Sequence, residues 1–412
     1  MIEFFCPQPQ DLVPLRSGPL APHLDGFATL LVRQGYSRHR CRSKLHLAAN
    51  LSQWLADQGL GLEQLDERQS AAFLEARWRT YSRDGGESCT LTLLLQHLRQ
   101  TGLIPLPRVP CARNSVDRLV GDYEQFLLQQ RGLLRGSVSV YLGVLRRFLK
   151  HRFSDGQARL RQLRAGDAAD FILQASARYG RRSLQSATKV LRSFFGFLLQ
   201  EGRIRRPLAN AVPKVAARGL AELPKSLDVV QVRRLLRSCD QRRRTGRRDY
   251  AVLLLLARLG LRAGEVAQLR LEDLDWGAGE VSVRGKGGRV DRLPLPHDVG
   301  RAIAHYLKTR RSIESSRQVF LRCKAPYQGF AGSGSVAGLV RRALVRAQLD
   351  PPHKGAHLLR HGLAIRMLRG GASLAQIGQV LRHQGAQSTQ IYAKVDLKVL
   401  RRLAQPWPGG AR

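Results

Sequence analysis

An unbroken run of apolar side chains, residues 250–256, follows a cluster of arginines in the second half of the chain. A helix built from this run is apolar on every side, and such a helix is stable only when neighbouring elements cover it all round. The run therefore predicts a buried helix at the centre of a packed domain. It is much shorter than the ~18 apolar residues that suggest a membrane span, and no apolar run in the chain reaches that length, so we expect no membrane partner.

Downstream of this helix the chain carries side chains suited to phosphoryl transfer, in the order Arg262, His357, Arg360, His383 and Tyr392. Attack on a phosphodiester builds negative charge on its non-bridging oxygens, and the planar donors of arginine match two such oxygens at once. A histidine moves a proton near neutral pH, and a tyrosine hydroxyl, with a free pKa of about 10, becomes a nucleophile once neighbours assist its deprotonation. The set predicts covalent phosphoryl transfer.

The spacing of these residues predicts that they meet in one cleft. His357 and Arg360 are three residues apart, which places both side chains on one face of a helix. His361 points about 100° away from Arg360 and is expected to be structural or a supporting partner. Ser373 predicts the N-cap of a second helix, and Tyr392 follows on a short helix that can approach the cleft.

Two stretches with alternating apolar residues, 279–284 and 289–295, flank the glycine-rich segment 285–288. This pattern predicts a β-hairpin, because alternation is typical of strands and clustered glycines favour tight turns. Lys286 then lies at the tip of the hairpin, from which a lysine side chain can reach into a DNA groove.

The order of these motifs resembles the tyrosine recombinase family, which includes phage integrases and chromosome-dimer resolvases. The resemblance covers residues 223–400 and, more loosely, residues 115–213. Five motifs carry it: Gly-Leu-Arg-x-x-Glu from Gly260, the Gly-Lys-Gly turn around Lys286, His-x-Leu-Arg-His from His357, Leu-x-His ending at His383, and Thr-x-x-Tyr ending at Tyr392.

The resemblance implies a role for each residue. Arg262 and Arg360 would clamp the scissile phosphate, with His357 and His383 as their histidine partners. Lys286 would protonate the leaving 5′ oxygen. The family requires neither a metal nor ATP, so the resemblance implies no cofactor.

By the same resemblance, Tyr392 would form a 3′-phosphotyrosyl bond, and either Glu265 or Asp273 would be a buried support for the first arginine. Two positions depart from the family pattern. Arg382 stands where the family usually has a glycine before the histidine, and Gly362 replaces the usual small hydroxyl residue. Neither departure removes a reacting group.

We expect a mainly α fold with a small β-hairpin or sheet in the catalytic domain. Periodicity and composition suggest helical blocks at 1–112 and 113–204, an extended linker (205–222) and a further domain with a C-terminal tail (223–412). The resemblance implies that residues 113–204 form a helical core-binding domain and residues 223–412 a mixed α/β tyrosine recombinase catalytic domain. The linker would let two domains close around a duplex. The candidates for phosphate contacts on the polar faces of the second domain are Arg131, Arg135, Arg146, Arg147, Arg181, Arg182 and Lys189.

Apolar and glycine positions in the first 110 residues recur 96 to 100 residues later. Phe73, for example, corresponds to Phe171, and Gly102 to Gly202. One hypothesis is that the N-terminal block is a degenerate second copy of the core-binding module. The alternative is two unrelated helical bundles with similar helix lengths. The expected use of the block is contact with an arm of the DNA or between protomers.

The chain contains 69 Lys and Arg against 31 Asp and Glu, a formal charge of +38. Such a balance predicts a polyanionic partner, and double-stranded DNA is the first candidate. Six separated cysteines without a Cys-x-x-Cys motif predict neither a zinc site nor a disulfide framework. We expect a cytoplasmic, nucleoid-associated protein whose thiols are reduced.

The family acts as four protomers on two DNA sites, so we expect a homotetramer on paired sites, with related recombinases as further partners. Apolar spacing in residues 397–403 predicts a tail helix that docks on a neighbour. Three alternative functions remain open: transposition of an insertion element by a member of the same family, supercoil relaxation of the type IB topoisomerase kind, and DNA binding without catalysis.

Overall fold

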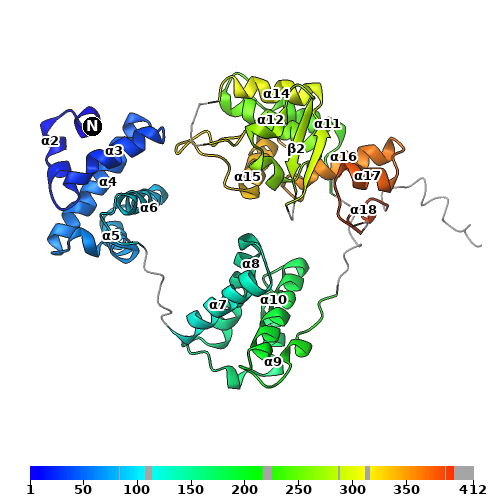
Figure 1. The fold of residues 1–412 in the computed structure, drawn as a ribbon, viewed down its shortest axis with the longest axis horizontal. Coiled ribbons are helices and arrows are strands. Elements are labelled where there is room, and N and C mark those ends of the chain that lie inside the picture. The colour runs from blue at the N-terminus through cyan, green and yellow to red at the C-terminus, as the bar shows by residue number, and fades with distance from the viewer. Residues whose placement is uncertain are drawn as a thin grey trace, which may run out of the picture. The chain divides into compact units, whose positions relative to one another are not determined.

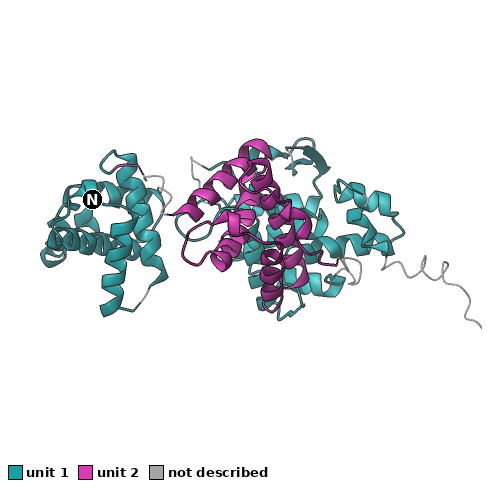
Figure 2. Ribbon diagram, turned by 90° about the horizontal axis from the view of Figure 1, so that it is seen from below, with its two compact units in different colours: residues 1–104, 220–412 teal, residues 105–219 magenta. Residues whose placement is uncertain are grey.

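A computed structural model describes residues 1–82, 84–106, 114–216, 225–285, 288–310, 316–385 and 387–393. The chain divides into two compact units (Figure 2), one made of residues 105–219 and the other of residues 1–104 and 220–412. Three large hydrophobic cores lie within residues 2–104, 119–212 and 227–359. The fold is mainly helical with one small sheet (Figure 1), which confirms the expected fold class.

The N-terminal block is helical throughout its described part. Asp66 caps α5 by accepting hydrogen bonds from the backbone of Arg68 and Gln69, at 2.8 and 3.0 Å. Its elements are α1 (Ile2–Phe5), α2 (Pro9–Leu12), η1 (Pro14–Arg16), η2 (Ala21–His23), α3 (Leu24–Arg33), α4 (Arg38–Asp57), η3 (Leu62–Gln64), α5 (Glu67–Thr80) and α6 (Gly85–Gln100).

The middle module, residues 114–212, contains the helices α7 to α10, and α10 contributes more buried residues to its hydrophobic core than any other helix. Leu191, Phe194 and Phe195 from that helix are almost fully buried. Leu208 and Val212 also lie in this core, so the first part of the segment expected as a linker packs on the module. The elements are α7 (Ser115–Gln125), which continues as a π-helix (Phe126–Gln130), α8 (Arg135–Arg152), η5 (Leu160–Gln162), α9 (Ala165–Ser176), α10 (Arg181–Gln200) and η6 (Leu208–Ala211).

The helix predicted from the apolar run is α12 (Arg244–Arg258), and it forms the centre of the C-terminal core. All residues from Ala251 to Ala257 are buried. The elements around it are α11 (Val229–Arg237), α13 (Ala263–Gln268), η7 (Leu271–Asp273), α14 (His297–Leu307), α15 (Ser333–Arg346) and α16 (His357–Arg369). None of the helices in the described part of the chain is long and apolar enough to cross a membrane.

The sheet contains β1 (Leu274–Asp275), β2 (Glu280–Arg284) and β3 (Val290–Pro294) in antiparallel order. Val281 pairs with Leu293 and Val283 with Asp291, which confirms the predicted hairpin. Val281 and Val283 face the core, while the residues between and beyond them are more exposed. The predicted tip residue, Lys286, lies outside the described residues.

The end of the described chain forms a small separate cluster. Here α17 (Leu374–Val380) and α18 (Gln387–Gln390) pack with α16 around Ile377, Leu381 and Tyr392. Ser373 caps α17 by accepting a hydrogen bond from the Gln376 backbone at 3.2 Å, as the sequence predicts. The predicted tail helix at residues 397–403 lies outside the described residues.

Candidate active site

The first arginine is held by a carboxylate from its own sequence motif. Arg262 is the N-cap of α13, and Glu265 reaches back to accept from its backbone N–H at 2.8 Å and from its Nη1 at 2.7 Å. Burial alone would raise the pKa of Glu265, but the backbone donor and the Arg382 and Arg262 charges outweigh it and lower the pKa. Glu265 therefore stays ionised and fixes the direction of Arg262.

Asp273, the other carboxylate considered for this support, contacts a different arginine. It is buried and accepts from Arg284 Nη1 at 2.6 Å and from the Arg270 backbone at 2.8 Å. Asp273 thus holds Arg284, the last residue of β2, and of the two carboxylates it is Glu265 that supports Arg262.

The second arginine is buried where three segments meet. Arg360 on α16 is 4% exposed and donates through Nη1 to the carbonyl of Gly260 and through Nη2 to the carbonyl of Leu381. Burial, followed by the charges of Arg262 and Arg382, lowers its pKa to about 10, so it remains a cation at neutral pH. Two backbone carbonyls therefore fix a charged guanidinium close to Arg262.

Two glycines allow these segments to approach. Gly260 has φ +59°, and a Cβ on it would lie 2.7 Å from Leu381 Cδ2. On α16, a Cβ at Gly362 would lie 2.8 Å from the carbonyl oxygen of Leu227. Close packing of α16 therefore explains why glycine replaces the small hydroxyl residue that the family pattern suggests at position 362.

The predicted nucleophile contacts a histidine that the sequence pattern had not assigned to it. Tyr392 is 1% exposed, and its hydroxyl lies 2.7 Å from Nδ1 of His361. Burial raises the pKa of Tyr392 to about 12, while the charge of Arg360 acts in the opposite direction. The neutral phenol is thus the resting form, and His361 is positioned to take its proton.

The other two histidines lie on either side of this pair. The ring of His383 stacks on Tyr392 at 6.5 Å between centroids, and its Nδ1 lies 2.7 Å from the Thr389 hydroxyl. The ring of His357 lies 6.1 Å from that of His361, one turn along α16. His357 is exposed whereas Arg360 is buried. The two side chains predicted to share one face of α16 therefore differ in their surroundings, with His357 at the edge of the site and Arg360 in its interior.

His383 gives the site a pH signature. Burial and then the Arg360 and Arg262 charges lower its pKa from 6.5 to about 4. Between these values the unfolded chain binds a proton that the folded ring does not, so the free energy of unfolding should increase with pH. We expect His383→Gln to reduce this pH dependence in thermal unfolding between pH 4 and 7. An unchanged dependence would contradict the assignment.

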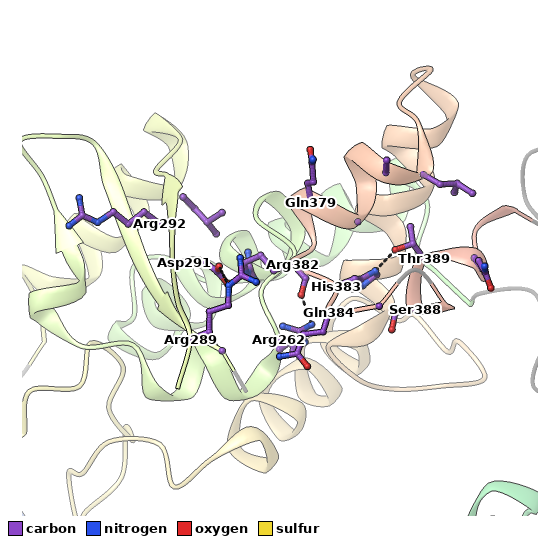
Figure 3. A pocket seen from close by; sticks show the side chains of 17 residues that line it. Arg262, Arg289, Asp291, Arg292, Gln379, Arg382, His383, Gln384, Ser388 and Thr389 are labelled. Carbon is purple, nitrogen blue, oxygen red and sulfur yellow. Dashed lines mark hydrogen bonds and ion pairs between the residues drawn. The ribbon is translucent and has the colours of Figure 1, made fainter. Parts of the chain in front are cut away.

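A cleft of about 930 Å³ is lined by Arg262, His383 and Thr389 (Figure 3), whereas the buried Arg360 and Tyr392 are not among its described lining residues. Arg262 and Arg382 face it from one side and Arg289 from the hairpin, with His383 and Ser388 opposite. Asp291 is its one carboxylate among the described lining residues. The cation excess suits an anion such as a phosphodiester.

The middle module carries the other predicted contacts. All seven basic side chains proposed for phosphate contact are exposed. Arg135 and Arg146 line the same groove, and Arg147 donates to the Tyr179 hydroxyl at 3.0 Å while its guanidinium lies over that ring. Their exposure leaves these cations accessible to a polyanion.

Comparison with known proteins identifies two family domains in the chain. Residues 225–398 match the phage integrase family, and residues 120–202 match the phage integrase N-terminal SAM-like domain. The chain is 44% identical to a putative integrase/recombinase, y4rA, of Sinorhizobium fredii, over 96% of both proteins. It is 30% identical to the tyrosine recombinase XerD of Listeria monocytogenes, over 67% of this chain and 94% of that protein.

Solved structures share the fold. The XerH recombinase bound to its palindromic difH substrate has a TM-score of 0.56 at 18% identity, over 70% of this chain and 85% of XerH. The Tn1549 transposon integrase in complex with circular intermediate DNA has a TM-score of 0.52 at 18% identity, over 71% of this chain and 100% of that chain. The chain therefore belongs to the phage integrase family and is a tyrosine recombinase, an enzyme of site-specific DNA recombination.

Proposed function

We propose that this recombinase cleaves and rejoins double-stranded DNA through a bond between Tyr392 and a 3′ phosphate, and exchanges strands between two sites. The observation that carries the proposal is the contact between the Tyr392 hydroxyl and His361, beside the two fixed arginines Arg262 and Arg360. These contacts support the proposal, because they bring a tyrosine, a histidine and two cations together within one domain.

In the proposed cleavage step, Tyr392 Oη attacks phosphorus while its proton passes to Nδ1 of His361. Arg262 and Arg360 neutralise the charge that develops on the non-bridging oxygens. The bond to the 5′ oxygen breaks, and Lys286 supplies the proton that this oxygen needs to leave as a hydroxyl. In the second step, a 5′ hydroxyl of the partner duplex attacks the phosphotyrosine and releases Tyr392.

The same proposal assigns supporting roles to the remaining histidines. His383 is neutral at pH 7 and packs on the Tyr392 ring, so its role is to orient the phenol and hydrogen-bond the phosphate. His357, exposed at the edge of the site, is placed to contact the phosphate or to hold His361. No step requires a metal or another cofactor.

Charge supports duplex DNA as the partner. Residues 105–219 contain 22 Lys and Arg against 7 Asp and Glu, and residues 220–412 contain 36 against 14. Both segments are thus strongly basic, as expected for binding to a phosphate backbone. We propose a homotetramer on paired sites, associated with the nucleoid, in which related recombinases can take the place of some protomers.

Strand exchange separates this function from supercoil relaxation. Genomic fragments bound by the protein would be sequenced, and two copies of the enriched site placed on one supercoiled plasmid. We expect deletion or inversion products joined at the two sites. Relaxed plasmid without joined products would indicate topoisomerase activity, and bound but uncleaved plasmid would indicate a non-catalytic relative.

We propose further that the N-terminal block is a degenerate copy of the middle module. The order of α3 to α6 with η3 matches that of α7 to α10 with η5. Glycines with positive φ occupy corresponding positions in both, as in the pairs Gly35 and Gly132, Gly59 and Gly156, and Gly102 and Gly202. The buried residues Thr90, Leu91, Leu94, Leu95, Leu98 and Ile104 have buried counterparts 100 residues later in Val190, Leu191, Phe194, Phe195, Leu198 and Ile204.

The proposed copy lacks most of the charges of its counterpart. Residues 1–104 contain 11 Lys and Arg against 10 Asp and Glu. The positions that correspond to Arg146 and Arg147 are Ala49 and Asn50. At the position that corresponds to Arg135 the N-terminal block keeps a cation, Arg38, whose guanidinium carbon lies 4.9 Å from the centroid of the Phe4 ring. This neutral composition favours contact between protomers over contact with DNA.

Salt dependence tests this assignment. Neutralising two exposed cations of the middle module, Arg146→Gln with Arg181→Gln, should reduce the slope of log affinity against log salt by up to about 1.8, because each phosphate contact contributes about 0.9. The matched pair in the N-terminal block, Arg33→Gln with Arg40→Gln, should leave the slope unchanged. An equal reduction by both pairs would show that the N-terminal block also binds DNA.

A further inference from the structure

Arg382 has a backbone conformation that disfavours its own side chain. Its φ is +55°, in the left-handed region, where a residue other than glycine costs roughly 1–2 kcal/mol. Among the described residues only Gln348, with φ +51°, shares this property without being a glycine. The side chain of Arg382 must therefore make contacts that offset the strain.

Those contacts are made with Glu265, the carboxylate that holds Arg262, and with Arg262 itself. The Arg382 side chain is 7% exposed, and its Nη2 donates to Oε2 of Glu265 at 2.7 Å. Oε2 also accepts from the Arg262 backbone, while Oε1 accepts from Arg262 Nη1. The backbone carbonyl of Arg382 accepts from Arg262 Nη2 at 3.0 Å. Both parts of residue 382 thus fix the first arginine.

The same guanidinium extends toward the hairpin. Its Nε lies 3.9 Å from Oδ2 of Asp291 on β3. Neither Nε nor Nη1 donates a hydrogen bond to any described residue, although both atoms are buried. Figure 3 shows Arg382 between Asp291 and the segment that carries His383, at the wall of the cleft. Unmet buried donors are costly, and an anion in the cleft would reduce that cost.

Sharing Glu265 between two arginines has an electrostatic consequence. A carboxylate paired only with Arg262 would neutralise much of the charge that a phosphate needs from that guanidinium. Arg382 pairs with the same carboxylate as Arg262, and Arg360 also lies within the electrostatic reach of Glu265. Three positive charges are therefore set against the one negative charge of Glu265. The excess positive charge remains directed at the cleft.

We propose that Arg382 is a positioning residue for strand cleavage, which orients Arg262 through Glu265 and keeps its charge available to the phosphate. The inference rests on the proposed function, because it assigns Arg262 to the phosphate. It also explains why this chain tolerates arginine at a position whose backbone suits glycine.

The test is Arg382→Gly in the full chain, assayed by single-turnover cleavage of a nicked duplex that carries the selected site. Glycine removes the buried contact to Glu265 but also relieves the backbone strain, and because these effects oppose each other the melting temperature should stay close to that of wild type. We expect the cleavage rate to decrease by about tenfold to a hundredfold, less than loss of a direct donor costs, with unchanged DNA affinity. Arg382→Lys should restore part of the rate, since an ammonium can still reach Glu265.

Gln348→Gly is the matched control. It relieves the same kind of backbone strain on the loop after α15 and should leave the cleavage rate unchanged. Wild-type cleavage by Arg382→Gly would overturn the inference, and so would a parallel decrease of stability, affinity and rate, which indicates a purely structural role. Failure of the wild-type protein to form any adduct would instead overturn the proposed function.

Discussion

Tyr392→Phe should abolish the covalent protein–DNA adduct, with a decrease in cleavage rate of about 10⁴-fold or more, because the attacking oxygen is lost. The phenyl ring keeps its packing against Ile377 and Leu381 in the small C-terminal cluster. The variant should therefore fold and bind DNA with unchanged affinity. The measurement is SDS-resistant adduct formed on a nicked duplex that prevents religation.

Tyr306→Phe is the control for loss of a buried tyrosine hydroxyl. Tyr306 is 2% exposed, and its hydroxyl accepts from the Leu321 backbone at 3.1 Å in the same domain. Its loss should cost roughly 1 kcal/mol of stability and leave adduct formation intact. Adduct formed by Tyr392→Phe at the level of this control would exclude Tyr392 as the nucleophile.

Arg360→Ala should lower the rate of cleavage by about 10²- to 10³-fold, the range seen when one preorganised charge donor is removed. DNA affinity should change little, because binding is distributed over many phosphates. Arg360→Lys should recover little of the rate, since one ammonium cannot keep both carbonyl contacts, to Gly260 and Leu381, and also contact a phosphate. Rate and affinity are measured separately on the same duplex.

Arg366→Lys is the matched control on the same helix. Arg366 is partly buried and donates to the Ala257 carbonyl at 2.8 Å, whereas Arg360 donates to Gly260 and Leu381, close to Arg262 and His383 in the sequence. Its substitution should leave the cleavage rate within about twofold of wild type. If both substitutions lowered the cleavage rate equally, or if Arg360→Ala lost DNA affinity in proportion to its loss of rate, the assignment of Arg360 to the scissile phosphate would be wrong.

Local signals in the sequence were enough to predict the elements that carry the site. The Ser373 cap, the alternation around the hairpin and the continuous apolar run of α12 depend on neighbours within a few residues. The Arg262–Glu265 contact is equally local, because a capping geometry at spacing three brings the two side chains together.

Contacts between distant segments were not predictable in the same way. His361 was expected to play a structural or supporting part, because its direction on α16 differs from that of Arg360. Only the packing of the C-terminal cluster brings Tyr392, 31 positions along the chain, to its Nδ1. The i, i+4 spacing of His357 and His361 was the one available signal, and such spacing is common on helices.

The proposed role of Arg382 was also not predictable from sequence. The sequence shows that an arginine replaces a glycine, but the proposed positioning role depends on a left-handed backbone and on a carboxylate 117 positions away. Neither feature has a local pattern. Likewise, the sequence could not decide between Glu265 and Asp273, because both lie in short helices of the same domain and only tertiary packing assigns Asp273 to Arg284.

The chemical identity of the adduct tests the central claim most directly. Wild-type protein trapped on the nicked duplex would be digested with protease and nuclease, and the modified peptide sequenced by mass spectrometry. The account predicts a single phosphorylated residue, Tyr392, joined to the 3′ side of the break, with a free 5′ hydroxyl on the released strand. A linkage through another residue, or through a 5′ phosphate, would contradict it.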